Sequence, residues 1–206
     1  MPRQLHLLPI LFLFLTTVMV KADGWESLAE DGISEAEIPG WVEPTDWRSQ
    51  ACPIPDGESL FQVLEDRQTD ARGGDVSHFH HRAYEVVAQS GLEEVGRIAV
   101  PFNAGYQGLL IHRMVLWRGD QRIDQLSPEA LRVATLGNSE RSRIHGEWRV
   151  LYPIFQGVQV GDHLELCYSL IGKDPAYGGR QEGSFLVDTT RPLGIDSIRF
   201  LFDPNE

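Results

Sequence analysis

Cys52 and Cys167 are the only cysteines of the chain and therefore its candidate thiol nucleophiles. A catalytic thiolate needs a base within hydrogen-bond reach and a group that lowers its pKa, such as a helix N-terminus. All seven histidines precede Cys167, and Cys52 stands in Cys-Pro-Ile-Pro, which is no helix start. The sequence therefore favours a catalytic role for neither cysteine, and we expect no catalytic residue.

A histidine cluster, His78, His80 and His81, is the second group that could do chemistry. Along an extended strand, His78 and His80 would point to the same side, which is a spacing suited to metal ligands. Asp75 is near, but the sequence shows no third ligand. A solvated strand end is the favoured interpretation, so we expect no metal site and no cofactor.

Two further segments could contact another molecule. Arg118-Gly119-Asp120 spells an adhesion tripeptide, but its Gly-Asp pair lies between apolar residues and is typical of a hairpin turn. Residues 174–179, next to Lys173, form a predicted loop rich in glycine. Loops often carry function, so this one either binds a partner or simply connects two strands.

The N-terminus has the three parts of a cleavable export signal, which we place at residues 1–22. Arg3 supplies the positive start, residues 7–20 carry no charge, and Val20-Lys21-Ala22 provides an exit for cleavage after Ala22. The apolar run has about 14 residues, whereas a membrane-spanning helix needs about 20. We therefore expect an exported protein, periplasmic or secreted, without a membrane span after cleavage.

Acidic residues are concentrated in the segment that follows. The precursor has a net charge of −12, and residues 23–75 alone hold 14 acidic side chains against three arginines. Such charge disfavours binding to nucleic acid or anionic membranes. Residues 23–75 therefore form a predicted acidic lead-in, extended or partly disordered. Apolar positions 60, 61, 63 and 64 predict one short helix within it, near residues 60–68.

Export bears on the two cysteines, because disulfides form in oxidising compartments. The pattern of residues 163–171 places Cys167 on the polar face of a strand, where the lead-in could lie across it. A bond closing a loop of this length would stabilise the fold by about 4–5 kcal/mol in the chain-entropy model. The sequence leaves two outcomes open, a Cys52–Cys167 disulfide or two free thiols.

From residue 76 to residue 206 the pattern changes to that of an all-β domain, with apolar runs separated by Gly, Pro, Asn and Asp. The clearest strand is residues 163–171, in which apolar and polar side chains alternate strictly, as in a half-buried strand. The pattern predicts strands near residues 78–89, 95–101, 109–118, 121–126, 130–136, 146–155, 163–171, 183–189 and 195–202.

Several pieces of this region occur in an order that resembles a known bacterial family. They are Ile38–Val42, Tyr84–Gly91, Ile98–Asn103, Leu110–His112, Trp117–Asp120 and Val158–Glu165 followed by Tyr168. The order resembles the domain of unknown function that precedes a transglutaminase-like domain in many exported bacterial proteins. The resemblance spans about residues 40–202.

The resemblance implies an immunoglobulin-like antiparallel β-sandwich that carries no catalytic residues of its own. In such proteins the transglutaminase-like domain follows, with catalytic Cys, His and Asp in that order. Here the sequence ends at Glu206, soon after the last predicted strand. We therefore expect this domain without its transglutaminase-like neighbour.

The favoured function is that of a non-enzymatic exported β-sandwich which binds a protein, as an interaction or accessory module of a transglutaminase-like partner. One alternative is a cysteine-dependent or metal-dependent hydrolase or transferase, acting through Cys52 or the His78 cluster. Another is one chain of a split transglutaminase-like enzyme. A purely structural envelope protein is the remaining possibility.

Overall fold

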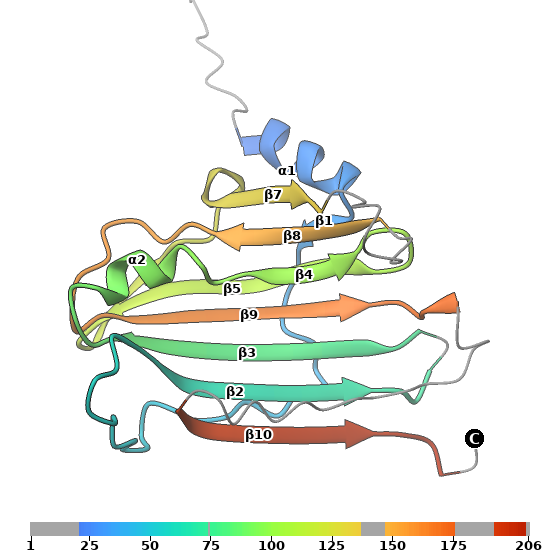
Figure 1. The fold of residues 1–206 in the computed structure, drawn as a ribbon. Coiled ribbons are helices and arrows are strands. Elements are labelled where there is room, and N and C mark those ends of the chain that lie inside the picture. The colour runs from blue at the N-terminus through green and yellow to red at the C-terminus, as the bar shows by residue number, and fades with distance from the viewer. Residues whose placement is uncertain (1–20, 74, 137–146, 176–191, 205–206) are drawn as a thin grey trace, which may run out of the picture.

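The computed structural model describes residues 21–73, 75–136, 147–175 and 192–204. Within these residues the chain forms a seven-stranded sheet, a three-stranded sheet and three short helices (Figure 1). The helices are α1 (Lys21–Glu30), α2 (Gly91–Val95) and the 3-10 turn η1 (Pro128–Ala130). The prediction of a mostly β fold is confirmed.

The large sheet has the strand order β1-β5-β9-β3-β2-β10, with β6 paired to β5. Its strands are β1 (Ile33–Glu35), β2 (Leu60–Asp70), β3 (Ser77–Val86), β5 (Gly108–Arg118), β6 (Gln121–Asp124), β9 (His163–Ile171) and β10 (Leu193–Leu201). The central pairs β5–β9, β9–β3 and β3–β2 are antiparallel. Both end strands are parallel to their neighbours, β1 to β5 and β10 to β2.

This topology does not match the immunoglobulin-like antiparallel sandwich expected from the resemblance. An immunoglobulin sandwich divides its strands between two antiparallel sheets of similar size. Here one mixed sheet holds most of the strands, and the small sheet has only the order β4-β8-β7. Two parallel strands must be joined by a long connection. Long stretches of chain do separate β1 from β5 and β2 from β10.

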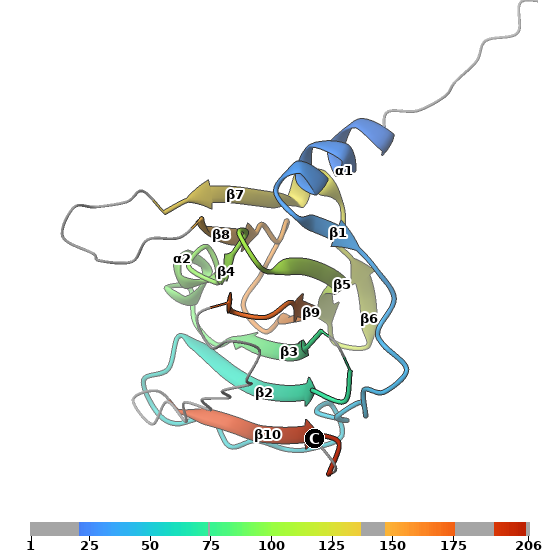
Figure 2. The ribbon, with the colours of Figure 1, turned by 90° about the vertical axis from the view of Figure 1, so that its right-hand side faces the viewer.

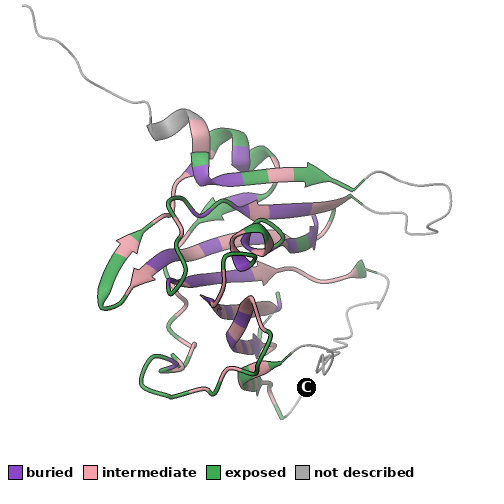
Figure 3. Ribbon diagram, turned by 60° about the vertical axis from the view of Figure 1, so that its left-hand side comes forward, coloured by how far each residue is buried: buried purple, intermediate pink, exposed green. Residues whose placement is uncertain are grey.

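The main hydrophobic core lies between the two sheets. The small sheet consists of β4 (Val100–Asn103), β7 (Leu131–Thr135) and β8 (Trp148–Pro153). Its buried side chains, such as Phe102 and Leu151, join Leu164, Leu166 and Tyr168 of β9 in one cluster. Figure 3 shows that buried residues concentrate in the strands and that the connecting segments are largely exposed. We call this side of the large sheet its inner face.

The prediction of a short helix near residues 60–68 is wrong, because this segment is strand β2. A β-bulge between Gln62 and Leu64 shifts the register against β3 and leaves both Val63 and Leu64 buried. Two adjacent buried residues break the alternation of a strand and imitate the spacing of an amphipathic helix. The strand predicted at residues 183–189 lies outside the described residues.

The acidic lead-in contains more regular structure than its composition predicts. It begins with α1, whose Leu28 is buried in the core, and continues through β1 to Glu35. Residues 36–59, here called the crossing segment, then pass over the side of the large sheet opposite the small sheet (Figure 2). We call that side the outer face. Residues 1–20 of the predicted signal lie outside the described residues, and Lys21 and Ala22 begin α1.

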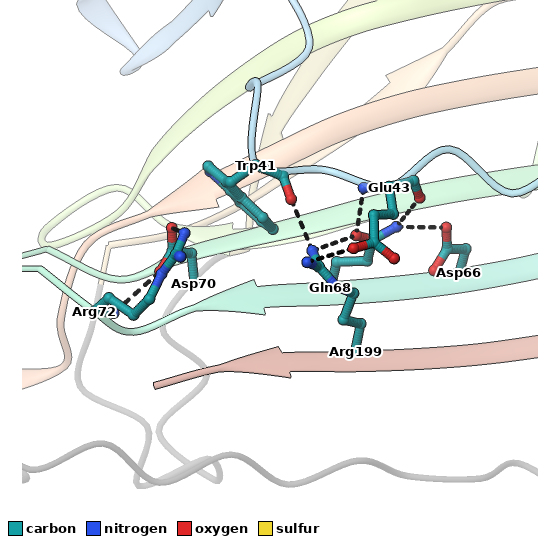
Figure 4. A network of polar contacts seen from close by, with 7 residues as sticks. All are labelled: Trp41, Glu43, Asp66, Gln68, Asp70, Arg72 and Arg199. Carbon is teal, nitrogen blue, oxygen red and sulfur yellow. Dashed lines mark hydrogen bonds and ion pairs between the residues drawn. The ribbon is translucent and has the colours of Figure 1, made fainter. Parts of the chain in front are cut away.

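A polar network fastens the crossing segment to β2 and β10 (Figure 4). The side-chain amide of Gln68 accepts a hydrogen bond from the backbone N–H of Glu43 at 3.0 Å and donates one to its carbonyl at 2.5 Å. The buried carboxylate of Asp66 accepts bonds from Gln68 and from the Thr45 hydroxyl, both on Oδ2. Arg199 donates to the carbonyl of Trp41 at 2.7 Å. One glutamine side chain thus pairs with the backbone as a neighbouring strand would.

Replacement of Gln68 by Ala is expected to lower the free energy of unfolding by about 1–3 kcal/mol, because it removes both hydrogen bonds to the backbone of Glu43 and one donor to the buried carboxylate of Asp66. Urea unfolding followed by circular dichroism measures this loss. Gln121→Ala, an exposed position on β6, is the matched control and should change stability by less than about 0.5 kcal/mol. Equal effects of the two substitutions would show that the hydrogen bonds of the Gln68 side chain contribute nothing to the free energy of unfolding.

Candidate functional site

Three side chains with metal-ligating or proton-transferring atoms meet on the outer face: His81 of β3 and Glu165 and Cys167 of β9. Their ligand atoms all lie within 4.8 Å of one another. The Nε2 atom of His81 is 3.0 Å from Oε1 of Glu165, and Sγ of Cys167 is 4.0 Å from that oxygen. All three residues are buried. The register explains the meeting, since His81 and Cys167 are direct partners across β3 and β9.

Glu165 is held in its charged form by its surroundings. Arg113 donates a hydrogen bond to Oε1 at 2.8 Å, and the indole of Trp117 donates one to Oε2 at 2.7 Å. Burial alone would raise the pKa of this carboxyl, but contact with His81, Arg113 and Trp117 outweighs burial and lowers the pKa to about 2. A permanent anion therefore lies in the middle of the cluster.

The neighbouring thiol has the opposite character. Burial strongly raises the pKa of Cys167, and the carboxylate of Glu165 raises it further. A thiolate is the reactive form of cysteine, so this environment keeps Cys167 as an unreactive thiol at neutral pH.

Both cysteines are free in the structure, so the Cys52–Cys167 disulfide is not formed. The crossing segment does pass over the face that carries Cys167, as the disulfide hypothesis requires. Cys52, however, packs with Trp47 and Val63 in a separate small cluster and approaches Gly194 at the start of β10. Cys167 instead lies beside Glu165 on the central strand β9. The path of the crossing segment therefore places Cys52 beside β2 and β10, whereas Cys167 lies on β9.

The histidines that the sequence singled out divide between the two faces. His78 and His80 do share one side of β3, as predicted, but His78 pairs with the Thr69 hydroxyl at 3.0 Å. The ring of His80 stacks on Tyr168, with centroids 4.8 Å apart. Only His81 points to the outer face with Glu165 and Cys167. Sequence reasoning missed this group, although the alternation along residues 163–171 already placed Glu165 and Cys167 on one face.

The Arg118-Gly119-Asp120 tripeptide forms the turn of the β5–β6 hairpin, as predicted. Gly119 has φ of +56°, a value that favours glycine. Arg118 makes a bidentate contact with the buried Asp162, at 2.9 and 2.7 Å. Its guanidinium is thus engaged with the protein itself. Of the predicted loop near Lys173, residues 176–179 lie outside the described residues.

An open groove of about 410 Å³ lies between the crossing segment, the hairpin turn and the outer face. Arg48 donates to the carbonyl of Gly119 at 2.9 Å and lies 4.0 Å over the ring of Trp117. His163 and Glu85 also line the groove, with Nε2 and Oε2 3.2 Å apart. Cys52 lines the same groove. A cysteine, a histidine and a carboxylate therefore share one surface depression.

The large sheet ends in an apolar strip formed by β10 and the residue that follows it. Ile198, Phe200 and Phe202 are 45%, 39% and 59% exposed, and they follow one another at every second position. The rings of Phe200 and Phe202 have centroids 6.0 Å apart, so they form one continuous surface. We call these three residues the β10 patch. Among the described strands, β10 has a single neighbour, β2.

Comparison with known protein families identifies a match that covers most of the chain. The family model of a domain of unknown function with solved structures, DUF3857, matches residues 72–205. A crystal structure described as "a putative protease from Parabacteroides distasonis" is similar, with a TM-score of 0.57 and 11% sequence identity over 71% of this chain and 29% of that chain. The likeness shows a shared fold, and this chain corresponds to less than a third of that protein. No curated protein matches the chain.

We expect Asp162→Asn to destabilise the chain at pH 7, because Arg118 loses its anionic partner. The Arg118 contact and the N–H of Gln159 lower the pKa of Asp162 below its ordinary 3.8, although burial opposes them. This contribution to stability is therefore complete above pH 4 and disappears as the pH falls through the lowered pKa. Urea midpoints of both proteins between pH 7 and pH 2 measure the difference.

Asp124→Asn is the matched control, since Asp124 pairs with Arg122 on the surface of the same hairpin. It should have little effect at any pH. A difference between wild type and Asp162→Asn that stays constant down to pH 2 would contradict an electrostatic role for Asp162.

Proposed function

The chain belongs to the DUF3857 family, a domain of unknown function, and we propose that it is a non-enzymatic exported module that binds a protein partner through β10. The observation that carries the proposal is the β10 patch on the end strand of the large sheet. Export is supported by the signal-like residues 1–22. Among the described residues, none of the helices has the length and apolar composition of a membrane span.

The position of β10 supports strand-mediated binding. β10 is nine residues long and pairs with β2 along most of its length. Proteins commonly protect such end strands by shortening, bulging or covering them, because their free backbone groups attract further strands. A long end strand with apolar side chains is a site for strand addition, in which backbone bonds give affinity and side chains give specificity.

The patch itself supports an apolar contact with the partner. Ile198, Phe200 and Phe202 present branched and aromatic surface to solvent, whereas monomeric proteins usually bury such residues. Aromatic side chains are enriched in the central parts of protein interfaces. The chain is strongly acidic, with a net charge of −12, so electrostatic attraction would contribute little to the binding of another acidic protein.

We propose further that the partner is a transglutaminase-like protein. The support for this finer step is the order of motifs that resembles the domain found before transglutaminase-like domains. β10 lies at one end of the large sheet, so a neighbouring protein can reach it.

We expect the tagged full chain to retain a specific protein from the envelope fraction of its own organism, and Ile198→Lys to lose it. A lysine on the patch must be desolvated on binding, which should weaken affinity for the purified partner at least about 10-fold. Mass spectrometry identifies the partner, and titration calorimetry measures the affinity.

Val160→Lys is the control, because Val160 is similarly exposed but lies away from β10. Identical retention by both variants would overturn the role of the patch. Retention of a protein without a transglutaminase-like sequence would support the module and overturn the finer proposal.

The groove beside Cys52 favours a second candidate, a cysteine-dependent hydrolase. His163 and Glu85 form a paired histidine and carboxylate in the groove that Cys52 lines. A paired histidine of this kind is the base that activates a cysteine nucleophile. Against it, Cys52 also contacts the apolar side chains of the small cluster on the outer face.

A screen of the purified chain against peptide and ester substrates distinguishes the two candidates. The interaction module predicts no turnover above that of Cys52→Ala. Turnover that is lost in both Cys52→Ala and His163→Ala, but retained in Cys167→Ala, would establish the enzyme instead.

A further inference from the structure

The cluster of His81, Glu165 and Cys167 brings three metal-ligating atoms together at a buried position. The Nε2 atom of His81 is buried and has no hydrogen-bond partner among the described residues, although it lies 3.0 Å from Oε1 of Glu165. Two electronegative atoms at this distance without hydrogen-bond alignment can both face a shared cation.

A second unpartnered atom lies on the next strand. Asp66 is the direct partner of His81 across β2 and β3, and it is completely buried. Its Oδ2 accepts bonds from Thr45 and Gln68, whereas its Oδ1 has no partner among the described residues. Buried polar atoms are rarely left without partners in native proteins. Asp66, His81 and Cys167 thus form a row across three adjacent strands, with Glu165 beside it.

From this arrangement we propose that the outer face of the large sheet contains a structural Zn²⁺ site formed by His81, Glu165 and Cys167, whose ligand atoms already lie together. Asp66 lies outside this group of atoms, and its carboxylate moves toward the bound ion to supply the fourth ligand. The set of one sulfur, one nitrogen and two oxygens suits a tetrahedral zinc ion. Soft thiolate and imidazole ligands disfavour Mg²⁺ and Ca²⁺, which prefer an all-oxygen shell. The closed, buried position indicates a structural rather than a catalytic ion.

Charge is balanced at this site when the ion is bound. Zinc coordination requires the Cys167 thiol to release its proton, which leaves three anionic ligands around the metal. The ion supplies two positive charges, and the guanidinium of Arg113 beside Glu165 supplies the third. Arg113 and Trp117 also hold Glu165 in position from behind, as outer-shell partners do for metal ligands.

The ion would connect β2, β3 and β9 on the face where the crossing segment lies. Because its ligands are buried, it must enter as the sheet forms, so zinc binding and folding are coupled. The zinc ligands share no residue with the β10 patch, so zinc binding does not depend on the proposed partner.

The test uses the full chain, unfolded and stripped with a chelator and then refolded with increasing amounts of Zn²⁺. We expect about one zinc per chain by elemental analysis after dialysis, and a melting temperature that rises with added Zn²⁺ until the site is full. Replacement of zinc by Co²⁺ should produce a thiolate-to-cobalt charge-transfer band in the near ultraviolet. Asp66→Asn should weaken zinc binding at least about 10-fold.

Cys167→Ser should abolish the charge-transfer band, while Cys52→Ser, which removes the other thiol, should retain it. If Cys167→Ser does not fold, the zinc and cobalt titrations of wild type and Cys52→Ser decide the matter alone. A folded wild-type chain that binds well under one equivalent, or a band that depends on Cys52, would overturn the proposal.

Discussion

The structure depends on the polar groups that β2 buries on its outer face. Asp66 and Gln68 lie in the interior of a sheet, where an unpaired amide or carboxylate is costly. The crossing segment supplies partners to both of them through Thr45 and the backbone of Glu43. An acidic segment that its composition predicts to be poorly ordered is therefore held in one path by the bonds it makes, and not by a core of its own.

That path determines what the outer face offers. It places Trp47 over the small apolar cluster and directs Arg48 to the hairpin turn, which together create the groove. The same path brings the Thr45 hydroxyl to the buried Asp66, which lies in one row with the buried His81 and Cys167. The inner face has a different basis, since the small sheet packs apolar side chains against it and Glu65, His80 and Arg82 form a separate polar group there. Both faces of the sheet thus combine apolar packing with polar contacts, and the crossing segment lies on the outer one.

Sequence patterns predicted the parts of this fold that are local. The strict alternation in β9 and the Gly-Asp turn after β5 are visible because one face of the strand is buried and because glycine adopts φ that other residues avoid. β2 was missed because its bulge leaves the adjacent residues Val63 and Leu64 both buried.

The candidate sites depended on information that no local pattern contains. The position of Cys52 follows from contacts between the crossing segment and β10, which are far apart in the sequence. The sequence therefore could not decide between a disulfide and two free thiols. Similarly, Glu165 and Cys167 could be assigned to one face of their strand, but their meeting with His81 depends on the register between β3 and β9.

The pairing of β10 with β2 has a consequence for the order in which the chain can fold. Arg67 and Asp196, which form an ion pair across these strands, are separated by 129 positions in sequence. Contacts of such separation form late, because a long loop must close before they stabilise anything. During synthesis, β2 must keep one open edge until residues 193–201 have emerged. The pairing of β10 is thus a late step of folding, and the strand that pairs late also carries the apolar patch.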